Sequence, residues 1–426
     1  MTIRSNGCGC SVGGAQPDPA QAGIQTKYAD MLGPRFRAAC LASCVSRTMG
    51  DVRRRPLIAA SKQCAGRSSP QFCEMKPVVS VVMPVRDGSR WLREAICSLR
   101  LQTFDALEIV IVDDGSADES PHIINTSAQS DSRIRAFRQE RLGLVAALNR
   151  GISESRGDLI ARLDADDLAT PDRLLRQIDF LERHREVGLL GTWAVQIDEC
   201  GRDNGRREPP TDSEQLSALL QRTNPFLHSS IVIRRSLLQK VGPYRPALEG
   251  AEDYDLWIRI SEHAKVANLA EHLLQYRVHR DNATPRARVR QLFSTRLAQI
   301  SAAARRSGRS DPIDQLSGPA DWRDAKFLRS PLWADVAGLY RFLELADPAV
   351  MANTTDDDVQ IAAIANPKIT LTHAERRLAQ LALMNLVRRR STRLSRSALL
   401  WQLVRLHPLR AVRLCSQAFH DALTRK

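Results

Sequence analysis

Residues 157–174 read Gly157-Asp-Leu-Ile-Ala-Arg-Leu-Asp-Ala-Asp-Asp-Leu-Ala-Thr-Pro-Asp-Arg-Leu174, and the organisation of the chain follows from this segment. It opens with apolar residues typical of a buried strand and then delivers three carboxylates, Asp164, Asp166 and Asp167. Thr170-Pro171 predicts a helix with an N-cap and a proline in its first turn. The acids should therefore lie on the loop after a strand, where an open α/β sheet places its ligands.

Three neighbouring carboxylates suggest a metal site. Their like charges repel one another, and a divalent cation would relieve that repulsion. Hard carboxylate oxygens suit Mg²⁺ or Mn²⁺. A solvated acidic turn is the alternative interpretation, because Asp-X-Asp alone is a common pattern.

The composition is that of a soluble protein, with 426 residues, of which 43% are hydrophobic and 26% charged. No uninterrupted apolar stretch could span a bilayer, and the N-terminus lacks the apolar core of a signal peptide, so we expect a cytoplasmic location. The formal net charge is +14, with basic runs such as Arg388-Arg389-Arg390 late in the chain. Such runs indicate a solvated helix face, or contact with an anionic membrane or an acidic partner.

The sequence predicts three regions. Residues 1–75 show no strand periodicity, and we expect a poorly ordered N-terminal extension. In residues 76–285, buried strands such as the one that ends at Pro84 alternate with amphipathic helices, which predicts an open, mostly parallel α/β sheet flanked by helices. Residues 286–426 show helical patterns only and form a basic C-terminal region.

A second acidic turn follows a second buried strand. The strand that ends at Val112 is followed by Asp113-Asp114-Gly115-Ser116. In an open α/β sheet, both strand ends can border one crevice. We find no Gly-X-X-X-X-Gly-Lys-Ser/Thr loop, and no Gly-X-Gly-X-X-Gly that opens a helix after a strand. A glycine-rich phosphate cradle is therefore not expected, and a metal bridge would replace it.

Several further motifs occur in a fixed order around these acids: Val79-Ser-Val-Val-Met-Pro-Val85, Leu99-X-X-Gln-Thr-Phe104, Glu108-Ile-Val-Ile-Val-Asp-Asp-Gly-Ser116, Gly143-X-X-X-Ala-Leu-Asn149-X-Gly, Asp164-Ala-Asp-Asp167, Pro171-Asp-Arg-Leu174 and Glu252-Asp-X-Asp-Leu-Trp257. This series resembles the family 2 glycosyltransferases over residues 76–285. The resemblance implies a GT-A fold. It also implies transfer of a sugar from a nucleotide diphosphate donor, with inversion at the anomeric carbon.

The resemblance also implies roles for the residues that match its motifs. Asp114, with Asp113 beside it, should contact the nucleobase, and Pro84 should line the nucleotide pocket. Asp164 should lie near the ribose and the metal. Asp166 should be the main protein ligand of the Mn²⁺ or Mg²⁺ on the diphosphate, whose cation would stabilise the charge of the leaving group.

Asp253, the second acid of the Glu252-Asp253 pair, matches the position of the family's general base. The alternative interpretation is that both acids only cap the helix that follows them. His279 could complete the metal or diphosphate site, and His228 also lies where such enzymes often place a histidine; each could equally be structural. Trp257 is expected in the core.

One motif departs from the family pattern. Many relatives carry Tyr-Asn after the proline of the first strand, whereas here Val85 is followed by Arg86-Asp87-Gly88. The change concerns contacts with the nucleobase, and family frequency favours uridine there. It leaves the metal ligands and the catalytic general base unaffected.

The leading hypothesis is therefore an inverting, metal-dependent transferase. It would move a sugar to a saccharide or lipid-linked acceptor in polysaccharide or glycoconjugate assembly. Family frequency favours a UDP-sugar as the donor. One alternative is a nucleotidyltransferase acting on sugar phosphates, for which Arg86-Asp-Gly-Ser-Arg90 is a thin match to the required loop. The other is a noncatalytic module that binds an anionic surface. We expect no nucleic acid partner.

The C-terminal region also carries two apolar stripes. The first comprises Leu378, Leu381 and Met384, with Leu386 off to one side, and the second comprises Leu399, Leu400, Leu403 and Leu406. Arginines lie between and beside the stripes, a pattern that suits a helix in an anionic membrane interface. The alternative is that the stripes pack on the catalytic domain.

Overall fold

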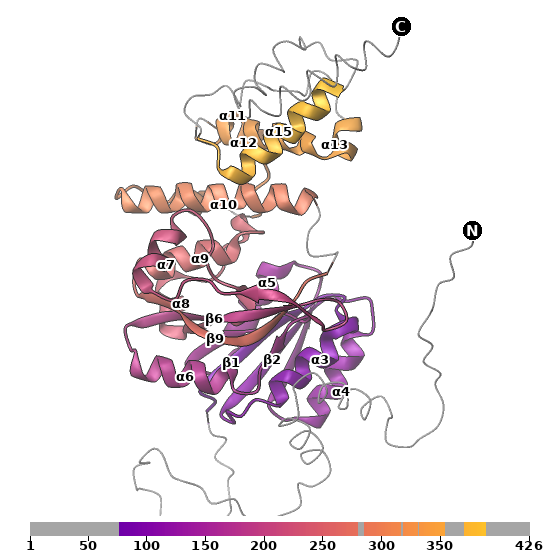
Figure 1. Cartoon of the computed structure of the whole chain (residues 1–426), viewed down its shortest axis with the longest axis vertical. Coiled ribbons are helices and arrows are strands. Elements are labelled where there is room, and N and C mark those ends of the chain that lie inside the picture. Colours follow the sequence, from indigo (N-terminus) through magenta and orange to yellow (C-terminus); the bar gives the residue numbers. More distant parts are fainter. Residues whose placement is uncertain (1–75, 280–284, 317, 331, 354–369, 389–426) are drawn as a thin grey trace, which may run out of the picture. The chain divides into compact units, whose positions relative to one another are not determined.

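The computed structural model describes residues 76–279, 285–316, 318–330, 332–353 and 370–388 (Figure 1). These residues belong to one compact unit, which is distinct from residues 1–74. The expectation for the N-terminal extension and the second apolar stripe both lie outside the described residues.

A nine-stranded sheet forms the centre of the unit. Its strands run in the order β3-β2-β1-β4-β8-β6-β9-β5, and β7 pairs with β6 outside this path. The strands are β1 Val79–Val85, β2 Leu107–Asp114, β3 Ile134–Gln139, β4 Leu159–Arg162, β5 Leu168–Ala169, β6 Val187–Ile197, β7 Asp203–Arg207, β8 Val232–Arg234 and β9 Lys265–Arg277.

The first half of the sheet is parallel and the second half is mixed. Strands β3, β2, β1 and β4 are parallel to one another. Strand β8 is antiparallel to both β4 and β6, while β6 and β9 are parallel. The predicted α/β sheet flanked by helices is confirmed, and the carboxyl ends of β1, β2 and β4 meet at one edge, as a ligand site requires.

Helices cover both faces of the sheet (Figure 1). They are α3 Ser89–Arg100, α4 Ser120–Ser130, α5 Leu144–Glu154, α6 Arg173–Arg183, α7 Ser213–Leu220, α8 Arg235–Val241 and α9 Glu252–Ser261. Because successive strand residues face opposite sides, Val81 and Met83 share a core with Leu92 of α3, whereas Val82 shares one with Leu148 of α5.

Two local expectations at strand and helix ends are wrong. Helix α6 begins at Arg173 with Asp172 as its N-cap, so Thr170 is not the cap. The reason is sheet pairing: Leu168–Ala169 form β5, and the Thr170 N–H donates to the Leu273 carbonyl at 3.0 Å.

Pro84 does not end its strand either, because β1 continues through Val85. Pro84 lies opposite Val112 of β2, whereas the ladder with β4 ends at Val82. A proline is tolerated where no neighbouring strand needs its missing N–H.

The described part of the C-terminal region is helical, as expected, and shares its core with the sheet and its flanking helices. Its α-helices are α10 Pro285–Arg306, α11 Ala325–Arg329, α12 Ala334–Leu343, α13 Pro348–Asn353 and α15 His373–Arg388. One continuous cluster of buried residues contains Trp257 of α9, Phe293 of α10, Tyr340 of α12 and Leu383 of α15. The expectation that Trp257 is a core residue is thereby confirmed, since none of it is exposed.

Helix α15 buries a different face from the one expected. Leu386 is fully buried, Leu378 and Met384 pack against the core, and Leu381 is 43% exposed. A spacing of three residues drifts around a helix, so the stripe Leu378, Leu381 and Met384 does not stay on one side. The buried face instead contains Ala379, Ala382, Leu383 and Leu386, spaced i, i+3, i+4 and i+7. Among the described residues, no helix combines the length and apolar character that crossing a bilayer requires.

Candidate active site

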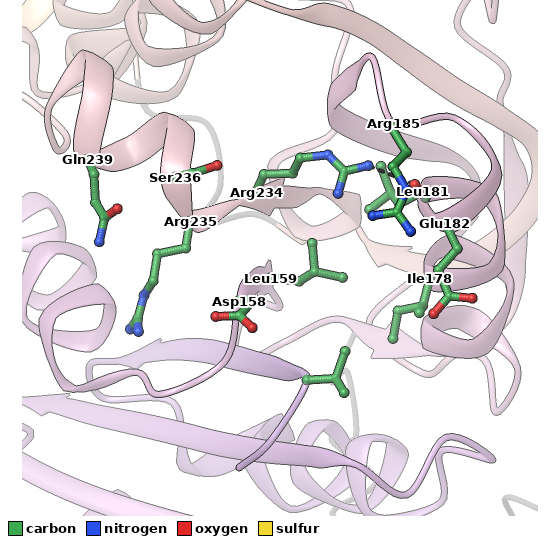
Figure 2. Close-up of a pocket in the computed structure, with 11 residues that line it drawn as sticks. Asp158, Leu159, Ile178, Leu181, Glu182, Arg185, Arg234, Arg235, Ser236 and Gln239 are labelled. Carbon is green, nitrogen blue, oxygen red and sulfur yellow. Dashed lines mark hydrogen bonds between the residues drawn. The ribbon is translucent and has the colours of Figure 1, made fainter. Parts of the chain in front are cut away.

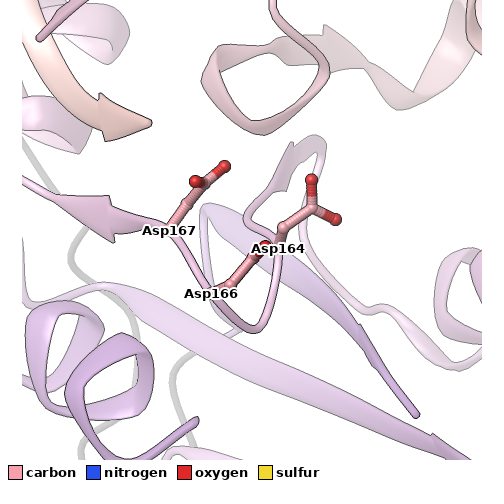
Figure 3. Close-up of side chains that lie close together, drawn as sticks. All are labelled: Asp164, Asp166 and Asp167. Atoms are coloured by element: carbon pink, nitrogen blue, oxygen red, sulfur yellow. The ribbon is translucent and has the colours of Figure 1, made fainter. Parts of the chain in front are cut away.

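The three aspartates of the central segment lie together on the loop that follows β4 (Figure 3). One ligand atom from each of Asp164, Asp166 and Asp167 lies within 4.8 Å of those from the other two. The loop then continues into the short strand β5 rather than directly into a helix. The sequence-based placement of these acids at a strand end is therefore confirmed.

Burial and mutual repulsion disfavour the ionised forms of the acids in this loop. Burial, followed by repulsion from Asp164, raises the pKa of Asp166, although its hydrogen bond with His279 opposes this. Burial and the neighbouring acids raise the pKa of Asp167 well above its usual range. The Oδ2 atom of Asp167 is also buried without a hydrogen-bond partner among the described residues. A cluster of hard oxygen ligands of this kind fits a divalent cation.

The end of strand β9 holds this loop from the far side. The backbone N–H of Arg277 donates to Asp167 Oδ1 at 2.8 Å, and its guanidinium Nε donates to the Asp166 carbonyl at 2.8 Å. Two residues later, His279 Nε2 lies 2.9 Å from Asp166 Oδ2. The His279 ring packs against Trp91 of α3, with 4.6 Å between ring centroids and a tilt of 39° between the rings. The structure thus brings His279 to the acid loop, as its proposed role requires.

Asp164 is held by partners of its own. Both of its carboxylate oxygens accept hydrogen bonds from the guanidinium of Arg162, the last residue of β4. Arg162 is buried, with 4% of it exposed, and therefore gives Asp164 a fixed counter-charge. The Ser229 hydroxyl donates to Asp164 Oδ2 at 2.8 Å. These bonds fix the orientation of Asp164 before any ligand binds.

The acidic pair Glu252-Asp253 lies at the first turn of α9. Asp253 Oδ2 accepts a hydrogen bond of 2.7 Å from Asn224 Nδ2, and Oδ1 accepts one of 2.6 Å from the Tyr254 N–H. Burial, followed by the charge of Asp253, raises the pKa of Glu252 to about 7. Burial also raises the pKa of Asp253. A carboxylate whose pKa is raised accepts a proton more readily than a carboxylate with the ordinary pKa.

A short 3₁₀ helix, η1 His228–Ser230, connects the two groups of acids. Ser229 binds Asp164, while the preceding residue, His228, has its Nδ1 4.0 Å from Asp253 Oδ2. The acid loop and Asp253 therefore border the same segment, although 89 positions separate Asp164 from Asp253 in the numbering (253 − 164).

The carboxylate of Asp114 is largely occupied by hydrogen bonds within the protein. Its carboxylate accepts hydrogen bonds from the backbone N–H groups of Leu142 at 2.8 Å and Gly143 at 2.9 Å, and from Gln139 Nε2 at 2.8 Å. Only 2% of Asp114 is exposed. These contacts hold the loop that leads into α5, and the contact of Asp114 with a nucleobase stays a prediction.

Asp113 and Pro84 lie at the same edge of the sheet. Asp113 Oδ1 accepts a hydrogen bond of 2.9 Å from the Ser116 N–H, and its Oδ2 is 3.4 Å from Arg138 Nε. Pro84 pairs with Val112, the residue before Asp113. Their assignment to the nucleotide pocket likewise stays a prediction.

The segment that departs from the family pattern is tied to this edge. Asp87 has a backbone φ of 48°, in the left-handed region that non-glycine residues seldom adopt. Its Oδ1 accepts a hydrogen bond of 2.8 Å from the Ala117 N–H, and its Oδ2 lies 2.6 Å from Arg141. Asp87 thus connects the loop after β1 with the loop after β2.

A cavity of about 370 Å³ lies elsewhere, beside the start of β4 (Figure 2). Asp158, Leu159, Arg234 and Arg235 are among its lining residues, whereas the acid loop follows the opposite end of β4. The guanidiniums of Arg234 and Arg235 donate to backbone carbonyls, including Val187 and Ser155. We therefore assign no ligand to this cavity.

Sequence reasoning missed several residues around the acids. Arg162 had a visible signal, because a charged residue stands inside an otherwise apolar strand directly before the acids. Asn224, Ser229 and Arg277 had none that distinguishes them from ordinary polar residues, since their partners are far away in the sequence. His228 was recognised as a candidate, but its neighbour Asp253 could not be inferred.

Comparisons with known proteins place this site in a family. Residues 80–242 match the family model described as Glycosyl transferase family 2. The chain is 34% identical over 225 residues to the uncharacterized glycosyltransferase MJ1057 of Methanocaldococcus jannaschii, which covers 51% of this chain and 77% of that protein. It is 34% identical to the amylovoran biosynthesis glycosyltransferase AmsE of Erwinia amylovora, covering 46% and 73%. For the putative glycosyltransferase EpsE of Bacillus subtilis, the identity is 35%, covering 48% and 74%. The chain therefore belongs to glycosyltransferase family 2.

Proposed function

We propose that the protein transfers a sugar from a nucleotide diphosphate sugar, with UDP as the nucleotide, to a hydroxyl group of a saccharide or lipid-linked acceptor. The transfer would invert the anomeric carbon and require Mn²⁺ or Mg²⁺. We further propose a role in polysaccharide or glycoconjugate assembly, which the similarity to a glycosyltransferase of amylovoran biosynthesis supports.

The observation that carries this proposal is the position of η1 between two groups of acids. Ser229 hydrogen-bonds Asp164 at 2.8 Å, and His228 lies 4.0 Å from Asp253. A donor whose diphosphate is near the acid loop would therefore have its sugar within reach of the carboxylate of Asp253. A transferase needs both functions in one site: stabilisation of the leaving group and activation of the acceptor.

The donor side follows from the acid loop. Asp166, Asp164 and His279 would hold the divalent cation, which when bound stabilises the negative charge that develops on the departing diphosphate. Arg277 keeps the loop in place through its bonds to Asp166 and Asp167. Asp113, Asp114 and Pro84 would border the nucleotide at the ends of β1 and β2.

The acceptor side follows from Asp253, with Glu252 beside it. An acceptor hydroxyl is a weak nucleophile until its proton is removed during attack. In the proposed reaction, the acceptor oxygen bonds to the anomeric carbon while its proton passes to Asp253. The bond from that carbon to the diphosphate oxygen breaks on the opposite face, and the electron pair leaves with the diphosphate, so the configuration inverts.

The family membership disfavours both alternatives. A sugar-phosphate nucleotidyltransferase would use the loop after the first strand to hold phosphates, but here Asp87 of that loop pairs with Arg141. A noncatalytic module would not need a buried carboxylate next to a second acidic cluster.

Donor turnover tests the proposal directly. We expect the full chain to release UDP from at least one member of a panel of UDP-sugars in Mn²⁺, and to lose this activity in EDTA. Readdition of Mn²⁺ should restore it. Including GDP-sugars in the panel identifies the nucleobase that the enzyme prefers. Nucleotide release that does not need metal, or no release from any nucleotide sugar, would contradict the proposal.

A separate prediction concerns membrane contact, which would bring the enzyme to a lipid-linked acceptor. We expect the protein to float with vesicles of anionic lipid at low salt and to sediment at high salt, because each arginine near such a surface contributes about 1 kcal/mol. Vesicles of neutral lipid are the control. Helix α15 exposes Leu381 but packs Leu378 and Met384 inward, so the contact would depend on residues beyond it. Failure to float at low salt would reject the contact.

A further inference from the structure

The two oxygens of Asp253 are fixed by different partners. Oδ2 accepts a hydrogen bond from Asn224 Nδ2 at 2.7 Å, and Oδ1 accepts one from the Tyr254 N–H at 2.6 Å. The side chain remains 18% exposed, so it is open on one side. Each oxygen of a carboxylate has two lone pairs, so each of these oxygens can accept one further hydrogen bond.

The amide of Asn224 is itself held in one orientation. Its Oδ1 accepts a hydrogen bond from the Phe226 N–H at 3.1 Å, in a turn typical of asparagine. With the carbonyl end engaged there, the NH₂ end faces Asp253. The segment before η1 thus presents a hydrogen-bond donor to the carboxylate whether or not an acceptor is bound.

Other charged and titratable groups also face Asp253. Arg162 of β4 contributes a positive charge, while Glu252 of α9 contributes a negative one. His228 of η1 is kept neutral, because burial and then the charge of Arg162 lower its pKa well below the usual value. Its Nε2 lies 2.8 Å from the hydroxyl of Tyr244, whose pKa burial raises. None of these groups donates a hydrogen bond to Asp253 as short as that of Asn224.

We propose that Asn224 is a positioning residue for the general base, which aims the free lone pair of Asp253 at the acceptor hydroxyl and stabilises the ionised carboxylate. This inference rests on the proposed role of Asp253 as the base. Neither the family motifs quoted above nor the residues carried over from them include Asn224.

Loss of the hydrogen bond from Asn224 should change the pH dependence of the rate in a defined direction. A hydrogen bond to the charged form of a carboxylate lowers its pKa. The base acts when deprotonated, so activity falls as the pH drops through its pKa. Removing the Asn224 donor raises that pKa, and the acidic limb of the pH–rate profile must therefore move to higher pH. Hydrogen bonds to charged groups correspond to a shift of about one to two pH units.

Three variants separate this role from simple support of the fold. Asn224→Asp keeps an oxygen for the Phe226 N–H but replaces the donor with a second acid, so the limb should move furthest. Asn224→Ala removes the donor and should move it by an intermediate amount. Asn224→Ser retains a donor and should lie nearest to the wild type. The affinity for donor, measured by thermal shift with UDP and Mn²⁺, should not change and shows that each variant is folded.

Asn385→Asp is the matched control, because Asn385 donates at 2.9 Å to the Leu345 carbonyl outside the site. It should leave the acidic limb in place. Folded Asn224 variants with an unmoved limb would reject the positioning role even if Asp253→Asn is inactive. Wild-type turnover in Asp253→Asn would instead reject Asp253 as the base. The two failures are therefore distinguishable.

Discussion

Replacement of Asp253 with asparagine should lower turnover at least about a hundredfold, the low end of what a general base contributes. The variant should bind the donor as tightly as the wild type, because Asp253 is proposed to serve the acceptor rather than the donor. Asparagine has nearly the same shape, and its carbonyl oxygen can keep one of the two hydrogen bonds that Asp253 accepts, from Asn224 or from the Tyr254 N–H. Loss of rate would then reflect loss of the proton acceptor rather than loss of structure. Steady-state transfer rates and UDP affinity, measured together, check this expectation.

Asp212→Asn provides the control for this change. Asp212 is the N-cap of α7, where its side chain accepts hydrogen bonds from the N–H groups of Glu214 and Gln215. Asparagine caps helices about as well as aspartate, so this variant should retain full activity. If Asp253→Asn also turned over at the wild-type rate, the base would have to be a different residue, with Glu252 the nearest acid to examine.

Replacement of Asp166 with alanine should abolish metal-dependent binding of the donor. Asp166 contributes a carboxylate to the acid loop and contacts His279 at 2.9 Å, so its removal takes away one charge and one partner of the proposed ligand set. A ligand present at a hundred times its dissociation constant stabilises the native state by about 2.7 kcal/mol. The wild type should therefore melt at a higher temperature with UDP and Mn²⁺, and the variant should show no such increase.

The Asp166 variant should also be tested for binding of the metal in the absence of nucleotide. Titration of Mn²⁺ without nucleotide should show weakened binding in Asp166→Ala, which tests the site independently of catalysis. Asp179→Ala is a suitable control because Asp179 is exposed on α6. Unchanged affinity for UDP in Mn²⁺ after removal of Asp166 would contradict the assignment of this carboxylate to the metal.

Local patterns were enough to predict the strands and acids of the parallel half of the sheet. The runs around Val81 and Ile109 are apolar and β-branched, and the acids follow them directly, so strand and site are encoded within a few residues. The same kind of reasoning was wrong at Thr170. Its local signal favoured a helix cap, but pairing with Leu273, about a hundred residues later (273 − 170 = 103), keeps the chain extended.

The contacts that fix the acids could not be predicted, because they join segments distant in sequence. Arg277 and Asp167 are 110 residues apart, and Asn224 and Asp253 are 29 apart. A polar residue gives no local sign of which distant partner it will meet. Arg162 is an exception in distance, because it lies only two residues before Asp164. Its charge within an apolar strand was visible, but the pairing depends on the conformation of the loop after β4.

The position of strand β9 has a consequence for recombination between relatives. The segment that matches the family model ends at residue 242. Asp253, and the Arg277 that holds the acid loop, come later in the chain. A chimaera joined at residue 242 would combine the acid loop of one parent with the proposed base and the loop support of the other. Under the proposed mechanism, such a hybrid would contain two halves of one reaction centre from different parents. The smallest exchangeable unit therefore runs from β1 through His279.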